Sequence, residues 1–326
     1  MNPFKSLVAP KLPPAAIGLS GEGACAVALD RRRDQFAVKR AAFTQLPAGL
    51  LHPNFDESNV SGPAELTGLL AELVANVGMS KRRRWSVALP EAATRTAILT
   101  MEGGAVSRNE SEEMVRWKTE RAIGAPLDEL RVARERLPAD AAGRPRYLVS
   151  AVRLGVLAEY EAAFEALGWH AGLILPRHMG EAWWLMRGAA RAAHEDALLV
   201  SSHNEGFTAV IMRGAQPLLV RNVICDVEDR ADELYRFLLF YRDRNAPPAF
   251  EGEEAIERVA PAESIERLLV AGTGLDAAEV GGIVAETLQV PPRTLGPADV
   301  RLSFPSDEID FRHLAAPAGL AALAWA

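Results

Sequence analysis

The chain opens with apolar runs whose spacing predicts strands and one helix. An alternating or continuous apolar pattern predicts strands, and a spacing of three to four residues predicts a helix. The predicted elements are strands at 15–20, 24–30 and 35–46, a helix at 64–78 and a strand at 85–90. The first turn places Glu22 between two glycines. A Gly-containing turn between apolar strands is typical of loops that hold phosphate.

The middle of the chain has a different order of elements. The patterns there predict a strand, a helix, two strands and a helix, at 94–101, 107–126, 128–138, 146–153 and 156–168. Residues 169–176 then return to a buried strand pattern. We therefore interpret 91–168 as a small α+β subdomain inserted into the first unit.

The opening pattern recurs in the second half. Residues 197–212 repeat the hairpin of 15–29 with a small polar turn, and a third strand and the helix 229–244 follow. A strand–turn–helix unit at 267–290 and an apolar helix at 314–326, which we expect to be buried, complete the chain. The repeat predicts an α/β protein with two similar lobes.

Composition limits the compartment and the class of partner. The 326 residues are 49% hydrophobic and carry a net charge of −7, which fits a folded chain and disfavours a nucleic-acid groove. The basic runs 31–33 and 81–84 are interpreted as solvated turns. Cys25 and Cys225 lie in separate apolar runs and predict no disulfide. We find neither a secretion signal nor a membrane-spanning run, and we expect a cytoplasmic protein.

Motifs for catalysis are sparse. The sequence has no GxSxG, HExxH or GxxxxGK[ST] motif, and its six histidines are scattered, so neither a hydrolase nor a metal centre is predicted. Gly272, Gly274 and Ala277 fit a dinucleotide-binding fingerprint, but the acidic residue that would hold the ribose does not follow. Of Trp183 and Trp184, one is expected in the core and the other at a subdomain or partner contact.

The order of these segments resembles the PilM family of actin-like type IV pilus assembly proteins and its relatives FtsA and GspL. The resemblance rests on segments spread over nearly the whole chain, namely the first turn at 18–23, the connection at 46–60, the strand into the insertion at 85–102, the third strand and helix at 217–244, the Gly turn and helix at 267–290, and the Ala/Gly/Leu helix at the C-terminus.

The resemblance implies an α/β fold of the actin-like, ribonuclease H-like type with two lobes. It divides the chain into a first lobe of 1–90 plus 169–196, the inserted subdomain 91–168, and a second lobe of 197–326. The extra subdomain of the second lobe is reduced to about 227–262.

The phosphate turns depart from the family pattern. In the family each turn has an Asp that organises Mg²⁺ and a Gly that lets the phosphates approach. By this resemblance Ser20 and Ser201 stand at the Asp positions, and Glu22 and His203 stand at the Gly positions. A carboxylate at Glu22 repels phosphate, and a hard cation loses its oxygen ligands.

The turn that resembles the family's adenosine motif is retained as Gly272, Thr273 and Gly274, and Gly23 remains in the first turn. Because both phosphate turns lack their carboxylate, we expect loops that keep their shape without binding ATP or Mg²⁺. We predict no catalytic residues and no enzymatic activity.

The resemblance implies a non-enzymatic scaffold of a type IV pilus or type II secretion-like assembly, peripheral to the inner membrane on its cytoplasmic side. The implied partner is the N-terminal cytoplasmic peptide of a PilN-like inner-membrane protein, held between the first lobe and the insertion 91–168. The alternative is a weak ATP-binding switch or a filament-forming protein, which Gly272 and Gly274 favour. Self-association and the particular machine stay open.

Overall fold

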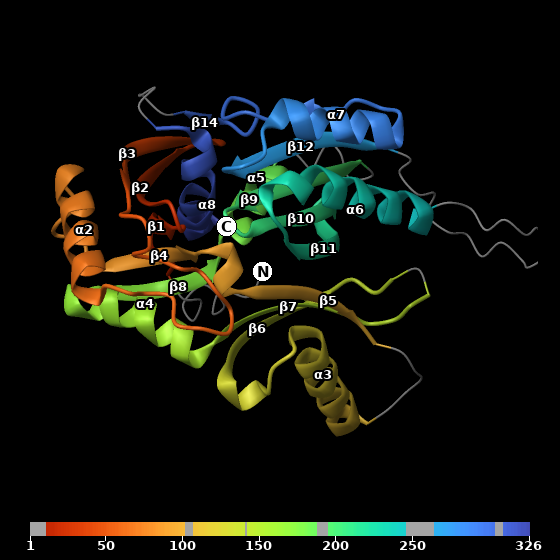
Figure 1. Cartoon of the computed structure of the whole chain (residues 1–326), viewed down its shortest axis with the longest axis horizontal. Coiled ribbons are helices and arrows are strands. Elements are labelled where there is room, and N and C mark those ends of the chain that lie inside the picture. The colour runs from red at the N-terminus through yellow and green to blue at the C-terminus, as the bar shows by residue number, and fades with distance from the viewer. Residues whose placement is uncertain (1–10, 102–106, 141, 188–194, 246–263, 304–308) are drawn as a thin grey trace, which may run out of the picture.

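The first lobe is built on a six-stranded sheet (Figure 1). The computed structural model describes residues 11–101, 107–140, 142–187, 195–245, 264–303 and 309–326. The strands of this sheet are, in spatial order, β14 (Leu302–Ser303), β3 (Gln35–Gln45), β2 (Gly23–Arg32), β1 (Ala15–Leu19), β4 (Arg84–Leu89) and β8 (His170–Pro176). β2 runs antiparallel to β1, whereas β4 runs parallel to it.

The second lobe repeats this arrangement. Its strands are, in spatial order, β11 (Gln216–Ile224), β10 (Gly206–Arg213), β9 (Asp196–His203), β12 (Ile265–Gly272) and β13 (Arg293–Thr294). β10 runs antiparallel to β9 and β12 runs parallel to it, as β2 and β4 do to β1. The predicted repeat is therefore confirmed. The antiparallel hairpin at the centre of each repeat does not occur in the parallel βαβ units of a dinucleotide-binding domain.

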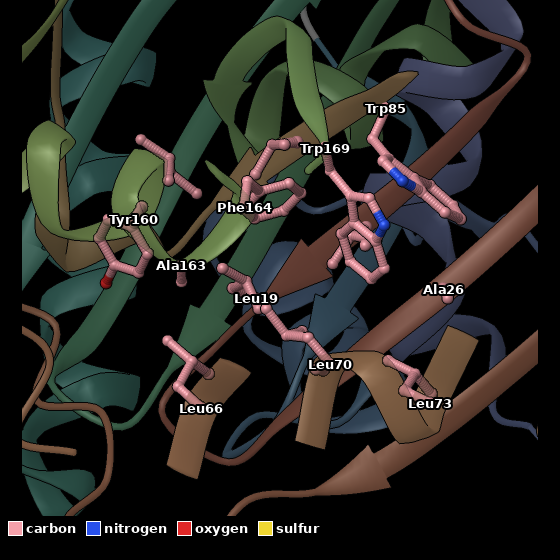
Figure 2. Close-up of a cluster of buried hydrophobic side chains, with 14 of the residues drawn as sticks. Leu19, Ala26, Leu66, Leu70, Leu73, Trp85, Tyr160, Ala163, Phe164 and Trp169 are labelled. Carbon is pink, nitrogen blue, oxygen red and sulfur yellow. The ribbon is translucent and has the colours of Figure 1, made fainter. Parts of the chain in front are cut away.

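Two helices cover the outer face of the first-lobe sheet. They are α2 (Pro63–Asn76) and α4 (Leu154–Ala166). Leu70 of α2 and Phe164 of α4 share one buried core with Trp85 of β4 (Figure 2). Burial of such aromatic and aliphatic side chains is the main source of stability in this layer.

The inserted subdomain is smaller than the sequence predicts. The expected insertion 91–168 includes α4, but α4 packs into the first-lobe core. The elements that extend from the lobe are β5 (Arg95–Thr100), α3 (Arg108–Ile123), β6 (Leu130–Leu137) and β7 (Arg146–Arg153), with the sheet order β5-β7-β6. The apolar spacing of α4 predicts an amphipathic helix, but spacing alone does not identify the sheet that its apolar side covers.

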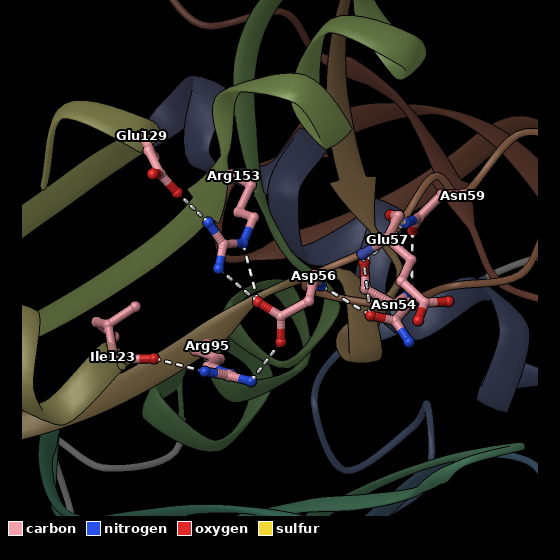
Figure 3. A network of polar contacts seen from close by, with 8 residues as sticks. All are labelled: Asn54, Asp56, Glu57, Asn59, Arg95, Ile123, Glu129 and Arg153. Atoms are coloured by element: carbon pink, nitrogen blue, oxygen red, sulfur yellow. Dashed lines mark hydrogen bonds and ion pairs between the residues drawn. The ribbon is translucent and has the colours of Figure 1, made fainter. Parts of the chain in front are cut away.

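A surface network fastens the insertion to the first lobe (Figure 3). The carboxylate of Asp56, in the loop before α2, accepts hydrogen bonds from Arg95 Nη2 at 3.0 Å and from Arg153 Nη2 at 2.6 Å. Arg153 also binds Glu129. Exposed ion pairs of this kind contribute little to stability, so their effect is mainly to orient the insertion.

Helices also cover the outer face of the second-lobe sheet. α6 (Arg230–Asn245) and α7 (Ala277–Leu288) pack there, with Phe237 and Val284 in one core. The sequence assigns 227–262 to a reduced extra subdomain, but α6 belongs to the layer of the lobe itself. Residues 246–262 lie outside the described residues. None of the described helices is long and apolar enough to cross a membrane.

The two lobes meet on a central pair of helices, α5 (Arg177–Arg187) and α8 (Phe311–Ala322), which share a core with both sheets (Figure 1). The C-terminal helix is buried, as predicted. Trp184 is a core residue whose Nε1 donates to the carbonyl of Ala315 at 2.8 Å. Trp183 is half-buried against the same core.

Glycines let these two helices touch. A Cβ at Gly180 of α5 would lie 2.2 Å from the carbonyl oxygen of Ala316, and a Cβ at Gly319 of α8 would lie 1.8 Å from the carbonyl oxygen of Gly180. Both obstacles are backbone atoms, which do not rotate away. The contact therefore requires glycine at both positions.

We expect Gly180→Ala to lower the free energy of unfolding by about 2 kcal/mol or more, because the added methyl group forces the central helices apart. Chemical denaturation measures the change. Gly68→Ala is the matched control, since Gly68 is exposed on α2 and a Cβ added there would meet nothing within 4 Å. That control should raise stability by about 0.5–1 kcal/mol. Equal effects of the two substitutions would contradict the close contact.

Candidate functional site

Three turns from both lobes converge at the carboxyl ends of β1, β9 and β12. They line one pocket, to which Glu22, His203 and Thr273 each contribute. In sheets of this kind the carboxyl ends of the strands are the usual place for ligands. The structure thus brings together the three turns that the sequence analysis singles out.

The predicted residues do not all face this pocket. Those that line it are Ser20, Glu22, His203, Gly272 and Thr273. Gly23 instead packs on the hairpin, where a Cβ would meet the ring of Phe43. Ser201 is fully buried on β9 beside the Glu181 carboxyl of α5, and Gly274 packs against Arg230.

The first turn is closed by its own serine. The backbone N–H of Gly23 donates to Ser20 Oγ at 3.1 Å, and the Ser20 hydroxyl donates to the carbonyl of Gly23 at 3.1 Å. The hydroxyl is therefore used within the turn. The turn keeps the compact shape that a hairpin needs, while the position offers no carboxylate for a metal ion.

A direct contact joins the two lobes across the pocket. The Thr273 hydroxyl donates to the carboxylate of Glu22, so the first turn of one lobe is bonded to the Gly turn of the other. A carboxylate at this place would also repel a phosphate group.

The guanidinium of Arg230, at the start of α6, occupies the second-lobe side of the site. It is 1% exposed and donates to the carbonyls of His203 at 2.6 Å and Asn204 at 2.7 Å. A Cβ at Gly274 would lie 1.7 Å from its Nη1. Gly272 and Gly274 have φ of 76° and 94°, so the turn keeps the shape of a ligand loop while Arg230 fills the space beside it.

Arg230 is not among the residues predicted from the sequence, although the sequence contains one signal for it. A cation at the first position of a helix is unfavourable, because the N-terminal end carries a partial positive charge and four free N–H groups. An Arg there, next to Asp229 and Asp232, indicates a side chain that is held by something other than the helix.

The space left at the site is small. The pocket has a volume of about 20 Å³, enough for roughly one water molecule. Sites for drug-sized ligands and cofactors have volumes of about 300–1,000 Å³. The residues present therefore do not fit a nucleotide in this arrangement of the lobes.

A second buried group, the carboxyl of Glu91, lines the same pocket. The carboxylate of Glu91, directly after β4, accepts hydrogen bonds from the backbone N–H of His178 at 2.6 Å, from its Nδ1 at 2.7 Å and from the hydroxyl of Thr208 at 2.8 Å. Asn222 of β11 donates to Thr208 at 2.7 Å and accepts from the backbone N–H of Thr96 at 3.2 Å. One chain of bonds thus joins the first lobe, α5, the second lobe and the insertion.

The carboxyl of Glu91 and the imidazole of His178 form a buried pair whose charges attract each other. Burial acts to raise the pKa of the Glu91 carboxyl, but the charge and hydrogen bonds of His178 outweigh it and hold that pKa at about 2. Burial acts to lower the pKa of His178, but the charge of Glu91 and their hydrogen bond raise it above its ordinary value. The charge and hydrogen bonds of each partner thus favour the ionised form of the other.

The fold is that of the actin-like ATPase class, with two lobes of like topology around a central site. The chain is similar over 97% of its length to 98% of a chain in a structure titled "PilM-PilN type IV pilus biogenesis complex", with 19% identity and a TM-score of 0.70. It is also similar to a Bacteroides thetaiotaomicron protein with an actin-like ATPase fold and unknown function, at 9% identity and a TM-score of 0.50 over 97% of this chain and 98% of that one.

No protein-family model matches the sequence, and the comparison with curated proteins gives no match. The structural comparisons confirm the predicted fold class and, at the level of the fold, the resemblance to PilM.

The His178–Glu91 pair predicts a pH dependence of stability. Because the pKa of His178 is higher in the folded state than the unfolded value of about 6.5, its stabilising effect is complete below about pH 6.5 and is lost as the pH rises through the folded-state pKa. We expect the free energy of unfolding to fall over this range in the parent protein. His178→Gln keeps a donor but does not titrate, so its stability should lack that fall.

Urea unfolding between about pH 6 and pH 9 makes the comparison. His313, whose pKa is lowered mainly by burial, is present in both proteins and cancels from the difference. Parallel stability curves for the two proteins would contradict a charged His178.

Proposed function

We propose that this chain is a non-enzymatic scaffold of a type IV pilus or related secretion assembly, at the cytoplasmic face of the inner membrane. In this proposal it binds the N-terminal cytoplasmic peptide of a PilN-like membrane protein. The support from comparison is the similarity of nearly the whole chain to a structure of a PilM-PilN complex. The observation that carries the proposal is a groove between two sheet edges.

This edge groove lies between β8 of the first lobe and β6 of the insertion. Its volume is about 50 Å³, and its walls include Ile174 and Leu175 of β8, Ala133 and Arg131 of β6, and Leu157 of α4. Within the described part of the chain, β8 has a strand partner only in β4, and β6 has one only in β7. Both strands therefore present an unpaired edge.

Because the groove itself has a volume of only about 50 Å³, the proposed ligand is an extended peptide that lies along an unpaired strand edge and enters the groove only in part. Added beside an edge strand, it gains main-chain hydrogen bonds, and its alternate side chains enter pockets. The aliphatic side chains of Ile174 and Leu175 suit apolar side chains of the peptide, and Arg131 suits a carboxylate. The network around Asp56 fixes the insertion to the first lobe and thereby sets the width of the groove.

We expect Ala133→Trp to weaken binding of the partner peptide at least tenfold, a loss of about 1.4 kcal/mol, because the indole would occupy the groove. Fluorescence anisotropy with the N-terminal cytoplasmic peptide of a PilN-like protein measures the affinity. Ala75→Trp, at an exposed position of α2, is the matched control and should bind as the parent does. Unchanged binding by Ala133→Trp would place the peptide elsewhere.

The same proposal holds that the chain has lost nucleotide binding and hydrolysis. It is supported by the small pocket, by Arg230 beside the Gly turn, and by Glu22 at the centre of the site. One observation favours the alternative of an ATP-binding switch or filament protein: Gly272 and Gly274 keep positive φ values.

Calorimetric titration of Mg·ATP separates the two functions. We expect no saturable heat at millimolar ATP, since binding would require Arg230 and the Glu22–Thr273 contact to move. A dissociation constant in the micromolar range would contradict the proposal of a scaffold that binds no nucleotide. It would favour the alternative of an ATP-binding switch. Arg230→Ala enlarges the site, and recovery of binding in that variant alone would identify Arg230 as the group that excludes the nucleotide.

A further inference from the structure

A large basic hollow lies at the end of the first lobe opposite the carboxyl ends of β1 and β4. Its volume is about 950 Å³. Of the described residues that line it, seven are basic and only Asp30 is acidic. The basic residues are Lys11, Lys39, Arg40 and the run Lys81–Arg84. The chain as a whole has a net charge of −7, so this concentration of positive charge is local.

Some of these cations have partners within the fold. Arg40 donates to the carbonyls of Val77 and Gly78, both at 2.7 Å, and so satisfies the end of α2. Lys39 pairs with Asp30 at 3.2 Å. These contacts explain why two of the seven positions are basic.

The remaining cations are not explained by the fold. Among the described residues, Arg83 donates only to the nearby carbonyl of Ser80, and Arg82 lies over the ring of Trp85 at 5.9 Å. Lys11, Lys81 and Arg84 have no ion pair with any described residue. The short connection between α2 and β4 does not require four consecutive cations. Their mutual repulsion in fact disfavours the folded state.

A tryptophan lies at the same hollow. Trp325 is half-buried, with its ring centroid 5.7 Å from that of Phe36, and its carbonyl accepts from Arg31 at 2.9 Å. Tryptophan is favoured where an apolar surface meets lipid headgroups. A polyanionic nucleic acid would instead require cations along an extended track on a basic protein.

We propose that the basic hollow is a docking surface for the anionic headgroups of a phospholipid bilayer. Clusters of four to eight Lys and Arg side chains attract such surfaces, and the attraction falls off within a Debye length. The contact is electrostatic and reversible, and it supplies one of the two signals that stable membrane attachment requires. It does not depend on the peptide partner.

The test uses the purified full chain and vesicles, without any partner. We expect co-sedimentation with vesicles that contain about one third phosphatidylglycerol, and none with pure phosphatidylcholine. Binding should be lost when NaCl is raised from about 0.05 M to about 0.5 M. Lys81→Glu combined with Arg84→Glu should weaken binding by about thirtyfold or more, since two attractive charges become repulsive.

The matched control is Arg116→Glu combined with Arg136→Glu. Both residues are exposed on the insertion, and the pair changes the net charge by the same amount. It should bind vesicles within about twofold of the parent. Thermal melts establish that each variant is folded. Equal losses in the two double variants, or equal binding to both kinds of vesicle, would overturn the proposal.

Two further probes distinguish other anionic partners. Polyglutamate and a short DNA duplex are titrated into the same protein. Binding of either one in the absence of vesicle binding would also overturn the lipid assignment. Failure of the vesicle test together with retained peptide binding would leave the proposed scaffold function intact.

Discussion

The backbone contact between α5 and α8 is the constraint on which the rest of the molecule depends. At Gly180 and Gly319 the helices approach until their main chains touch. The layer between the two sheets is therefore thin, and both sheets pack on the same helix pair. This packing brings the carboxyl ends of β1, β9 and β12 to one place. The convergence of the three turns follows from two glycines, one in α5 and one in α8, that are distant from the turns in sequence.

Polar groups then hold the lobes in one arrangement. The Glu22–Thr273 and Glu91–Thr208 contacts cross from the first lobe to the second, and Arg230 fills the space that the second-lobe turns enclose. Buried and half-buried groups of this kind are costly when a partner is removed, so they favour a single geometry more than they add stability. The proposed scaffold function would use such a fixed geometry, whereas the alternative of a nucleotide-driven switch would need two arrangements of similar free energy.

Local sequence patterns predicted much of the fold. The two hairpins, the helix predicted at 107–126 and the strand predicted at 128–138 are each encoded by their own spacing and turn residues, and all are present. The placement of α4 depends on packing with distant strands, and its assignment to the insertion 91–168 was wrong because α4 packs in the first-lobe core. The same reason applies to the site. The turns were found from their glycines, but Arg230 and Glu91 act through partners that only the folded chain brings near, and no local pattern encodes those distances.

The strand β8 runs from the basic hollow to the edge groove. Its first residue, His170, donates to the carbonyl of Arg83 beside the basic hollow, and its last residues form a wall of the edge groove. The strand has seven residues, so an extended chain laid along it covers roughly 23 Å. If both proposed surfaces are used, the length of β8 sets the distance between the lipid surface and the groove. The length of the polar leader on a membrane partner is then set by this strand, and a leader shorter than about seven residues would not reach.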